Sequence, residues 1–562
     1  MKPFSILLLL LLNLTLQAQE EKGTGMIFDP PSLRGIPYKV KLTASSYQSM
    51  PASASLEKYC PTAGDQGRYG TCVAFATGYH LRTILYAKME SEPDENGNIP
   101  YINPNAKIFS PTYIYEQIKD KGDNNCQAGT NPVNAFDLMK NSGVATLSKL
   151  PYSCGSSVNS AALQEAMDFR ITDYQILYYP NEEDDDLKVN SVKKALAEGY
   201  PCMLGFIVAK SFYNASGDVW KEEATDDGPT GQHGRHAMCV VGYDNNKYGG
   251  AFRVLNSWGT SWRDKGYVWI PYKDFAKYSL LAIQAYGPNK EFRPKPTPSV
   301  YVPKPRKKEN NDNPEPVKPS PKPTPAKPEP VKPQPKPTPY KPEPKPAPNK
   351  PEPVKPEPPK PAPLKPIIKA NLSGEVEFTL NTGDKMPANR VLTRNLIVAD
   401  DDDTKAYKED LVAYRMDNSY NSGTKFRFYI FSNSESYIYA FATDLTGKVN
   451  KIMPFDDNMS PRIGANSQVA FPSEKKVVKM DDNPGTDYML ILYSKEPLDA
   501  VQMLTKMNAA KGGLSQKIKA ALGDKLILPS EVTYSTSKIG FDVKKGEHKG
   551  AVVPLMVELS HK

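Results

Sequence analysis

Apolar residues recur at helical spacing between residues 72 and 200. In CVAFATGYHLRTILYAKME, which begins at Cys72, they lie three and four positions apart, and this spacing predicts one long helix. The segments PTYIYEQIKD, NPVNAFDLMKNSG and NSVKKALAEG are also expected to be helices. Gly143 and Gly199 are expected to end the last two.

The pattern changes after residue 200. CMLGFIVA, HAMCVVGYD, GAFRVLNSW and GYVWIPY are short apolar or alternating runs separated by Gly, Asn and Asp, which is typical of antiparallel strands. Helices followed by strands predict an α+β unit with a helical lobe and a β lobe.

The last two hundred residues alternate with period two. GEVEFTL, TKFRFYIFS, SYIYAFATD, KKVVKM and TDYMLILYS predict strands, whereas EPLDAVQMLTKMNAA and LSQKIKAAL predict helices. We therefore expect a mainly-β, sandwich-like domain with one or two appended helices.

Two segments do not have the pattern of a folded core. Residues 294–366 hold 29 of the 54 prolines, which predicts an extended polyproline II spacer, with a passive tether favoured over a recruitment site. Residues 1–18 contain an apolar run of about a dozen residues, shorter than the roughly 20 needed to cross a bilayer. They predict a cleaved export signal and not a membrane anchor.

The net charge of +8 lies mainly in the proline-rich segment, where 16 basic residues face 7 acidic ones. The remaining chain is close to neutral, so a nucleic-acid partner is not expected. Acidic runs at residues 182–186 and 400–403 lack the spacing of a calcium loop, and solvated loops are expected there.

All six cysteines precede the proline-rich segment. Cys126 and Cys154 lie in loop-like sequences and form the preferred disulfide. Cys202 and Cys239 lie in apolar, strand-like runs and are expected to be inert core thiols.

Cys72 is a candidate nucleophile, because unpaired N–H groups and the dipole at a helix start favour the thiolate. Such a nucleophile needs a base, a group that orients the base and donors for the oxyanion. His236 opens an apolar strand, Asn256 ends another, and Gln66 lies in a turn beside glycine. The alternatives are a structural thiol and the neighbouring His233 as the base.

DQGRYGTCVAFA, RHAMCVVGYD and VLNSWGTSWRDKGYVWI, in this order, resemble the active-site blocks of papain-like (C1 family) cysteine peptidases. The resemblance covers roughly residues 55–285. It implies that Cys72 is the nucleophile and His236 the base that forms a thiolate–imidazolium pair with it. It also implies that Asn256 orients the imidazole and that Gln66 donates to the oxyanion beside the Cys72 N–H.

The same resemblance implies substrate-binding roles for Gly129 and Trp258. The sequence departs from the family at Tyr69, where a cysteine usually forms a disulfide, and at Val73, where an aromatic residue is usual. An inhibitory prosegment of about a hundred residues does not fit before Cys72. Latency is expected to come from residues 20–50, from the C-terminal region or from the compartment.

The run that begins SESYIYAFATD, with NPGTDYMLILYSKEP, resembles a bacterial domain-of-unknown-function family often appended to exported enzymes. It implies a module that binds a surface or a protein ligand. The predicted divisions are a signal peptide (1–18), an N-terminal extension (19–50), the papain-like domain (51–290), the Pro/Lys-rich linker (291–366) and a β-rich accessory domain (367–562).

The sequence thus predicts an exported, periplasmic or extracellular cysteine endopeptidase acting on proteins or peptides. No cofactor, metal or integral membrane span is expected. Two alternatives stay open: an inactive papain-fold binding or adhesion protein, and an acyltransferase or deamidase that uses the same nucleophile.

Overall fold

The computed structural model describes residues 22–92, 98, 100–214, 216–231, 233–287, 372–391, 411–443, 447–546 and 548–562. The predicted signal peptide, the predicted linker and the acidic run at 400–403 lie outside the described residues. Two parts are described below, the N-terminal part (22–287) and the C-terminal part (372–562). No helix within these ranges is long and apolar enough to cross a membrane.

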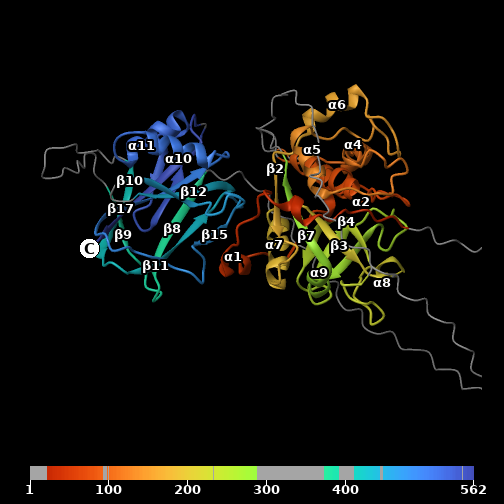
Figure 1. The fold of residues 1–562 in the computed structure, drawn as a ribbon, viewed down its shortest axis with the longest axis horizontal. Helices are drawn as coiled ribbons and strands as arrows, with labels where there is room; N and C mark the ends of the chain where they lie inside the picture. The colour runs from red at the N-terminus through yellow and green to blue at the C-terminus, as the bar shows by residue number, and fades with distance from the viewer. Residues whose placement is uncertain are drawn as a thin grey trace, which may run out of the picture. The chain divides into compact units, whose positions relative to one another are not determined.

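The α-helices of the N-terminal part are α1 (Ala44–Gln48), α2 (Cys72–Ala74), α3 (Thr83–Glu90), α4 (Pro111–Ile118), α5 (Pro132–Asn141), α6 (Ser160–Ala166), α7 (Asp185–Ala197), α8 (Lys210–Asn214) and α9 (Tyr272–Tyr278). In Figure 1, α4, α5 and α6 lie on one side of this part, with β3, β4, β7 and α9 on the other.

The predicted long helix runs from Cys72 to Glu90, but its middle, Phe75–Arg82, is π-helical. Local periodicity did not predict this wider turn. The helix α7 begins at Asp185, so the run at 182–186 is only partly a loop, contrary to expectation. The Asp184 side chain accepts a hydrogen bond from the Leu187 N–H and caps this helix, whose N-terminus favours acidic residues.

One antiparallel sheet forms the β lobe. It contains β1 (Ser53–Ser55), β2 (Asp173–Tyr178), β3 (Cys202–Val208), β4 (Gly234–Asp244), β5 (Ala251–Leu255), β6 (Tyr267–Pro271) and β7 (Ser279–Tyr286). The order is β2-β7-β3-β4-β5-β6, with β1 paired to β4. Helices and sheet share one core, in which Leu81 and Phe136 belong to the same buried cluster as Met203 and Val240.

The C-terminal part consists mainly of strands. These are β8 (Ser373–Leu380), β9 (Ala388–Arg390), β10 (Val412–Tyr420), β11 (Lys425–Ser432), β12 (Ser436–Thr443), β13 (Val449–Met453), β14 (Arg462–Ile463), β15 (Ser467–Phe471), β16 (Val478–Lys479), β17 (Gly485–Ser494), β18 (Val532–Tyr534), β19 (Ile539–Val543) and β20 (Val552–His561). Two helices, α10 (Ala500–Ala509) and α11 (Leu514–Leu522), follow β17.

These strands form two sheets, ordered β13-β12-β17-β20-β10-β9 and β15-β11-β8-β19-β18. Alternate side chains of β17 point to opposite faces of its sheet, so this strand contributes to two hydrophobic cores. Ile491 and Tyr493 belong to the core shared with the second sheet, whereas Leu490 and Leu492 pack in the core that includes α10 and α11. The predicted α+β two-lobe unit and the β-rich C-terminal domain with two helices are both confirmed.

The cysteines follow the prediction. Cys126 and Cys154 form a disulfide, and Cys202 and Cys239 are free and fully buried, as is Cys72. The disulfide closes the chain between α4 and α6 and so restricts the segment that carries Gly129.

His80 is the least satisfied polar residue of the π-helical segment. Its side chain is fully buried, and neither ring nitrogen has a hydrogen-bond partner among the residues that the structure describes. Burial lowers the pKa of His80 to about 3, so the ring stays neutral where an unfolded histidine binds a proton.

We expect His80→Leu to reduce the acid sensitivity of the N-terminal part. Between the unfolded pKa of about 6.5 and the folded pKa, the unfolded state binds one more proton than the native state. The free energy of unfolding therefore falls by about 1.4 kcal/mol for each pH unit of acidification, and His80→Leu removes this contribution.

Urea unfolding at pH 7.5 and pH 5 measures the effect. All four tryptophans lie in the N-terminal part, at residues 220, 258, 262 and 269, so their fluorescence reports on this part alone. Equal pH dependence in the wild type and His80→Leu would contradict the prediction.

Candidate active site

Cys72 starts the long helix and lies against the strand that carries His236. Its side chain is fully buried, and α2 packs on β4. Burial raises the pKa of the Cys72 thiol to about 11, although hydrogen bonds from the backbone of Ala237 and Gly25 oppose the shift. The sulfur is therefore next to the residue that follows His236.

His236 and Asn256 form a direct hydrogen bond of 2.7 Å between Nε2 and Oδ1. The Ser257 N–H also donates to Asn256 Oδ1, at 2.8 Å, which identifies this atom as the amide oxygen. An amide oxygen only accepts, so His236 Nε2 carries the proton, and Nδ1 of the neutral ring is the basic nitrogen. Nδ1 is buried and has no hydrogen-bond partner within the described residues.

Trp258 covers this pair. Its ring stacks on His236 with 4.8 Å between centroids, and Phe212, Tyr213 and Trp262 surround it at 5.3–5.7 Å. Burial lowers the pKa of His236 to about 4, and the hydrogen bond with Asn256 only partly opposes this shift. In the covered site both the thiol and the imidazole are neutral at pH 7.

Gln66 is fully buried with its amide group held at both ends. Its Oε1 accepts from Ser257 Oγ at 2.5 Å, so Nε2 is directed to the carbonyl oxygens of Gly23 (3.1 Å) and Tyr69 (2.7 Å). The Trp258 Nε1–H donates to the same Gly23 oxygen at 3.1 Å. The side chains of Gln66 and Trp258 thus converge on one carbonyl group.

Two tyrosines hold the loops around the site. The Tyr152 hydroxyl donates to the Gln66 carbonyl at 3.0 Å and lies 2.8 Å from Thr71 Oγ1, next to the start of the helix. The Tyr115 hydroxyl accepts from the Gly129 N–H at 3.2 Å. Gly129 has φ +76°, and a Cβ there would lie 2.1 Å from the carbonyl oxygen of Gly25.

The structure thus brings Cys72, Gln66, Gly129, His236, Asn256 and Trp258 to one place. His233 lies outside this group, because its Nε2 is 2.7 Å from the Gly228 carbonyl oxygen and 2.9 Å from Asp227. The sequence interpretation missed Ser257, and it named residues 20–50 as a source of latency without placing residues 23–27 at the site. The signal for Ser257 is its position directly after Asn256 in the LNSW stretch. For residues 23–27, the local signal is the pair of glycines in KGTGM.

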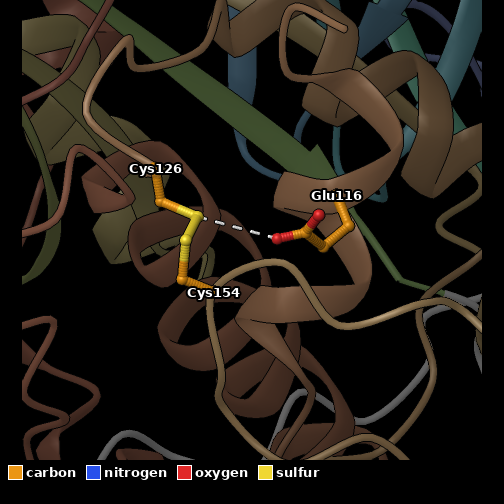
Figure 2. A group of neighbouring side chains, drawn as sticks. All are labelled: Glu116, Cys126 and Cys154. Carbon is orange, nitrogen blue, oxygen red and sulfur yellow. Dashed lines mark hydrogen bonds between the residues drawn. A yellow bond between two sulfur atoms is a disulfide. The ribbon is translucent and has the colours of Figure 1, made fainter. Parts of the chain in front are cut away.

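Glu116, Cys126 and Cys154 are a group with metal-ligating side chains. Figure 2 shows the Glu116 carboxylate directed at the Cys126–Cys154 disulfide, 3.7 Å from Cys126 Sγ. The sulfurs are bonded to each other, and Glu116 pairs with Lys119 and accepts from the Gly155 N–H, each at 2.7 Å. Thiolate ligands are not available here, so the group does not form a metal centre.

The N-terminal part is similar to known proteins. Residues 53–286 match the family described as papain family cysteine protease. The chain is 27% identical over 231 residues to an uncharacterized peptidase C1-like protein, L477, of Acanthamoeba polyphaga mimivirus, covering 39% of this chain and 67% of that protein. It is 27% identical over 279 residues to cysteine proteinase EP-B 1 of Hordeum vulgare, covering 48% and 66%.

Cathepsin L of Sarcophaga peregrina is 26% identical over 233 residues, covering 40% of this chain and 59% of that protein. The chain thus spans about three fifths to two thirds of the length of these relatives. Among solved structures, xylellain, a cysteine protease from Xylella fastidiosa, aligns with a TM-score of 0.39 and 22% identity over 49% of this chain and 99% of that chain.

Residues 53–286 are therefore a papain-family cysteine protease domain. Within the C-terminal part, residues 419–497 match a domain of unknown function, DUF4384. Both family resemblances predicted from the sequence are confirmed.

We expect Ser257→Ala to lower the kcat of peptide hydrolysis about tenfold with little change in KM. Without the Ser257 hydroxyl, the Gln66 amide loses the hydrogen bond at its Oε1, so Nε2 is held less firmly toward the place where we expect the oxyanion. Complete loss of one oxyanion donor costs about 10²–10³ in kcat, so a misdirected donor costs less.

Ser261→Ala is the matched control, since it makes the same chemical change at an exposed position of the same loop. Ser257→Thr keeps the hydroxyl and should restore kcat. A KM effect without a kcat effect would show that Ser257 does not act through Gln66.

Proposed function

We propose that this protein is an exported cysteine endopeptidase in which Cys72 is the nucleophile, His236 the general base and Asn256 the residue that orients the base. The hydrogen bond from His236 Nε2 to Asn256 Oδ1 carries the proposal. It leaves Nδ1 as the basic nitrogen, on a strand packed against the helix that starts at Cys72.

In the proposed reaction, His236 Nδ1 takes the proton of the Cys72 thiol, and the thiolate attacks the carbonyl carbon of a peptide bond. Gln66 Nε2–H and the Cys72 backbone N–H donate to the resulting oxyanion. His236 then gives its proton to the leaving amine as the C–N bond breaks, which leaves a thioester on Cys72. A water molecule, deprotonated by His236, attacks this thioester, releases the carboxylic acid product and restores the thiol.

The protonation of the pair depends on access to water. Burial holds the pKa of Cys72 above and that of His236 below their usual values, so the covered pair is neutral. Hydration of the site reverses both shifts, and each charge then stabilises the other. A thiolate–imidazolium pair is therefore proposed for the open site.

The substrate class proposed is protein or peptide. Gly129 is the proposed contact for the substrate backbone, and Trp258 is the proposed contact for the region past the scissile bond. In the structure, Gly129 lies against the backbone of Gly25, and the Trp258 indole donates to the carbonyl of Gly23. Export to the periplasm or the extracellular space and a localising role for the C-terminal domain complete the proposal.

Irreversible labelling with an epoxide inhibitor of the E-64 type tests the nucleophile. Labelling accumulates with time, so it registers even a small open fraction of the enzyme. We expect the label on Cys72, no label in Cys72→Ala, and a rate at least about 10²-fold lower in His236→Ala, as is typical when a general base is lost.

His233→Ala is the control histidine variant and should keep the wild-type rate. Undiminished labelling in His236→Ala, or peptide hydrolysis that persists in Cys72→Ala, would overturn the mechanism. Mass spectrometry of the products separates the reactions, because hydrolysis shortens a peptide, whereas deamidation keeps its length and acyl transfer joins it to an amine.

A further inference from the structure

The Tyr152 hydroxyl lies between the two segments that carry the proposed oxyanion donors. It donates to the Gln66 carbonyl oxygen at 3.0 Å and lies 2.8 Å from Thr71 Oγ1. A phenol has one hydrogen, so the Thr71 hydroxyl is the donor in the second contact. Gln66 supplies one proposed donor, its Nε2–H, and Thr71 directly precedes Cys72, whose backbone N–H is the other. One hydroxyl group thus joins both segments.

Thr71 does not cap the helix that it precedes. A threonine at this position usually accepts a hydrogen bond from an N–H of the first helical turn. Within the described residues the Thr71 side chain makes no such bond, although it is 2% exposed and adjoins α2. Burial raises the pKa of the Cys72 thiol, and the N–H groups of Val73 and Cys72 are among the backbone groups that oppose this shift. Because Thr71 bonds to Tyr152, these N–H groups stay available to the site.

Two aromatic side chains hold the Tyr152 ring edge-on. Its centroid lies 4.8 Å from that of Phe75, at an interplanar angle of 82°, and 6.4 Å from that of Tyr69, at 77°. Phe75 is buried in the long helix, and Tyr69 belongs to the loop between Gln66 and Thr71. Edge-to-face contacts favour one orientation of the ring, and this orientation fixes the position of the hydroxyl.

The backbone that carries Tyr152 is anchored on both sides. Before it, the Leu150 carbonyl accepts a hydrogen bond from Ser110 Oγ at 2.6 Å. After it, Cys154 forms the disulfide with Cys126. The hydroxyl therefore extends from a fixed segment of the helical lobe.

We propose that Tyr152 is a positioning residue that sets the separation of the two oxyanion donors. This inference rests on the proposed function, because it assigns a further residue to the same site. Gln66 is held from the β lobe by Ser257, whose carbonyl accepts from the Gln66 N–H at 2.9 Å and whose hydroxyl donates to Gln66 Oε1. Tyr152 holds the same residue from the helical lobe. Without its hydroxyl, the Gln66 backbone loses this second support, and Thr71 is free to turn toward the helix.

The test compares the full chain with Tyr152→Phe in two reactions of Cys72. Leupeptin, a peptide aldehyde, requires the oxyanion donors, because the sulfur bonds to the aldehyde carbon, the thiol proton passes to His236 and the aldehyde oxygen takes the negative charge. Iodoacetamide does not require them, because the sulfur displaces iodide from a CH2 group and no oxyanion forms.

We expect the dissociation constant of leupeptin, measured by its protection of Cys72 from iodoacetamide, to rise about tenfold in Tyr152→Phe. Complete loss of one oxyanion donor costs about 10²–10³ in kcat, so displaced donors cost less. The rate of alkylation without leupeptin should change by less than about twofold. The kcat of peptide hydrolysis should fall by about the same factor as leupeptin binding.

Tyr243→Phe is the matched control. The Tyr243 hydroxyl also donates to a backbone carbonyl, that of Pro51 at 2.7 Å, and its side chain is buried near the end of β4 opposite to His236. This variant loses a similar hydrogen bond, so it should lose similar stability, but both reactions of Cys72 should keep their wild-type values.

Thr71→Val is the second variant and keeps the inference testable if Tyr152→Phe does not fold. It removes the other hydroxyl of the same contact, so it should also weaken leupeptin binding. In the double variant the loss should be smaller than the product of the two single losses, because both residues act through one contact.

Two results would overturn the inference. One is unchanged leupeptin binding in the folded variants, and the other is an equal loss in leupeptin binding and alkylation, which indicates a general disturbance of the site. The proposed function fails separately. A wild-type protein that binds leupeptin but hydrolyses no peptide would contradict the peptidase, while the two reactions of Cys72 still decide the role of Tyr152.

Discussion

The hydrogen bond between His236 and Asn256 is the constraint on which the geometry of the candidate active site depends. It joins two neighbouring strands at the point where their pairing ends, because Leu255 pairs with Cys239 and Asn256 is the next residue along. The ladder thereby fixes the Asn256 backbone, and its side chain fixes which nitrogen of His236 is basic. Trp258, two residues later, covers the bond that results.

Burial of this site has two opposing effects, one on the hydrogen bond between His236 and Asn256 and one on the charged forms of Cys72 and His236. Exclusion of water strengthens the bond between His236 and Asn256, but it also disfavours every charged form of the cysteine and histidine. A peptidase of this type therefore needs a dry orienting hydrogen bond next to a nucleophile that water can reach. The structure has the orienting hydrogen bond in place, while residues 22–27 cover the nucleophile.

The sequence predicted the parts of the site that lie within short motifs. Cys72, Gln66, His236 and Asn256 each belong to a stretch with a recognisable pattern, and the strands around them alternate clearly. The π-helical turn could not be predicted, because α and π helices share the same residue preferences and differ through packing. The position of residues 22–27 depends on contacts with residues 66, 130 and 235, which are distant in sequence and leave no local periodicity.

Covalent attachment gives residues 22–27, which cover the site, a property that no separate ligand has. Dilution of the protein does not release it, because its concentration near the cleft is set by the chain and not by the solution. A substrate binds only those molecules in which the cleft is open. Its apparent dissociation constant is therefore the intrinsic dissociation constant divided by the open fraction. Once substrate saturates the cleft, however, the segment is already displaced and the chemical steps proceed at their full rate. A peptidase covered in this way would respond to the abundance of its substrate, with low activity where substrate is scarce and its maximal velocity where substrate is plentiful.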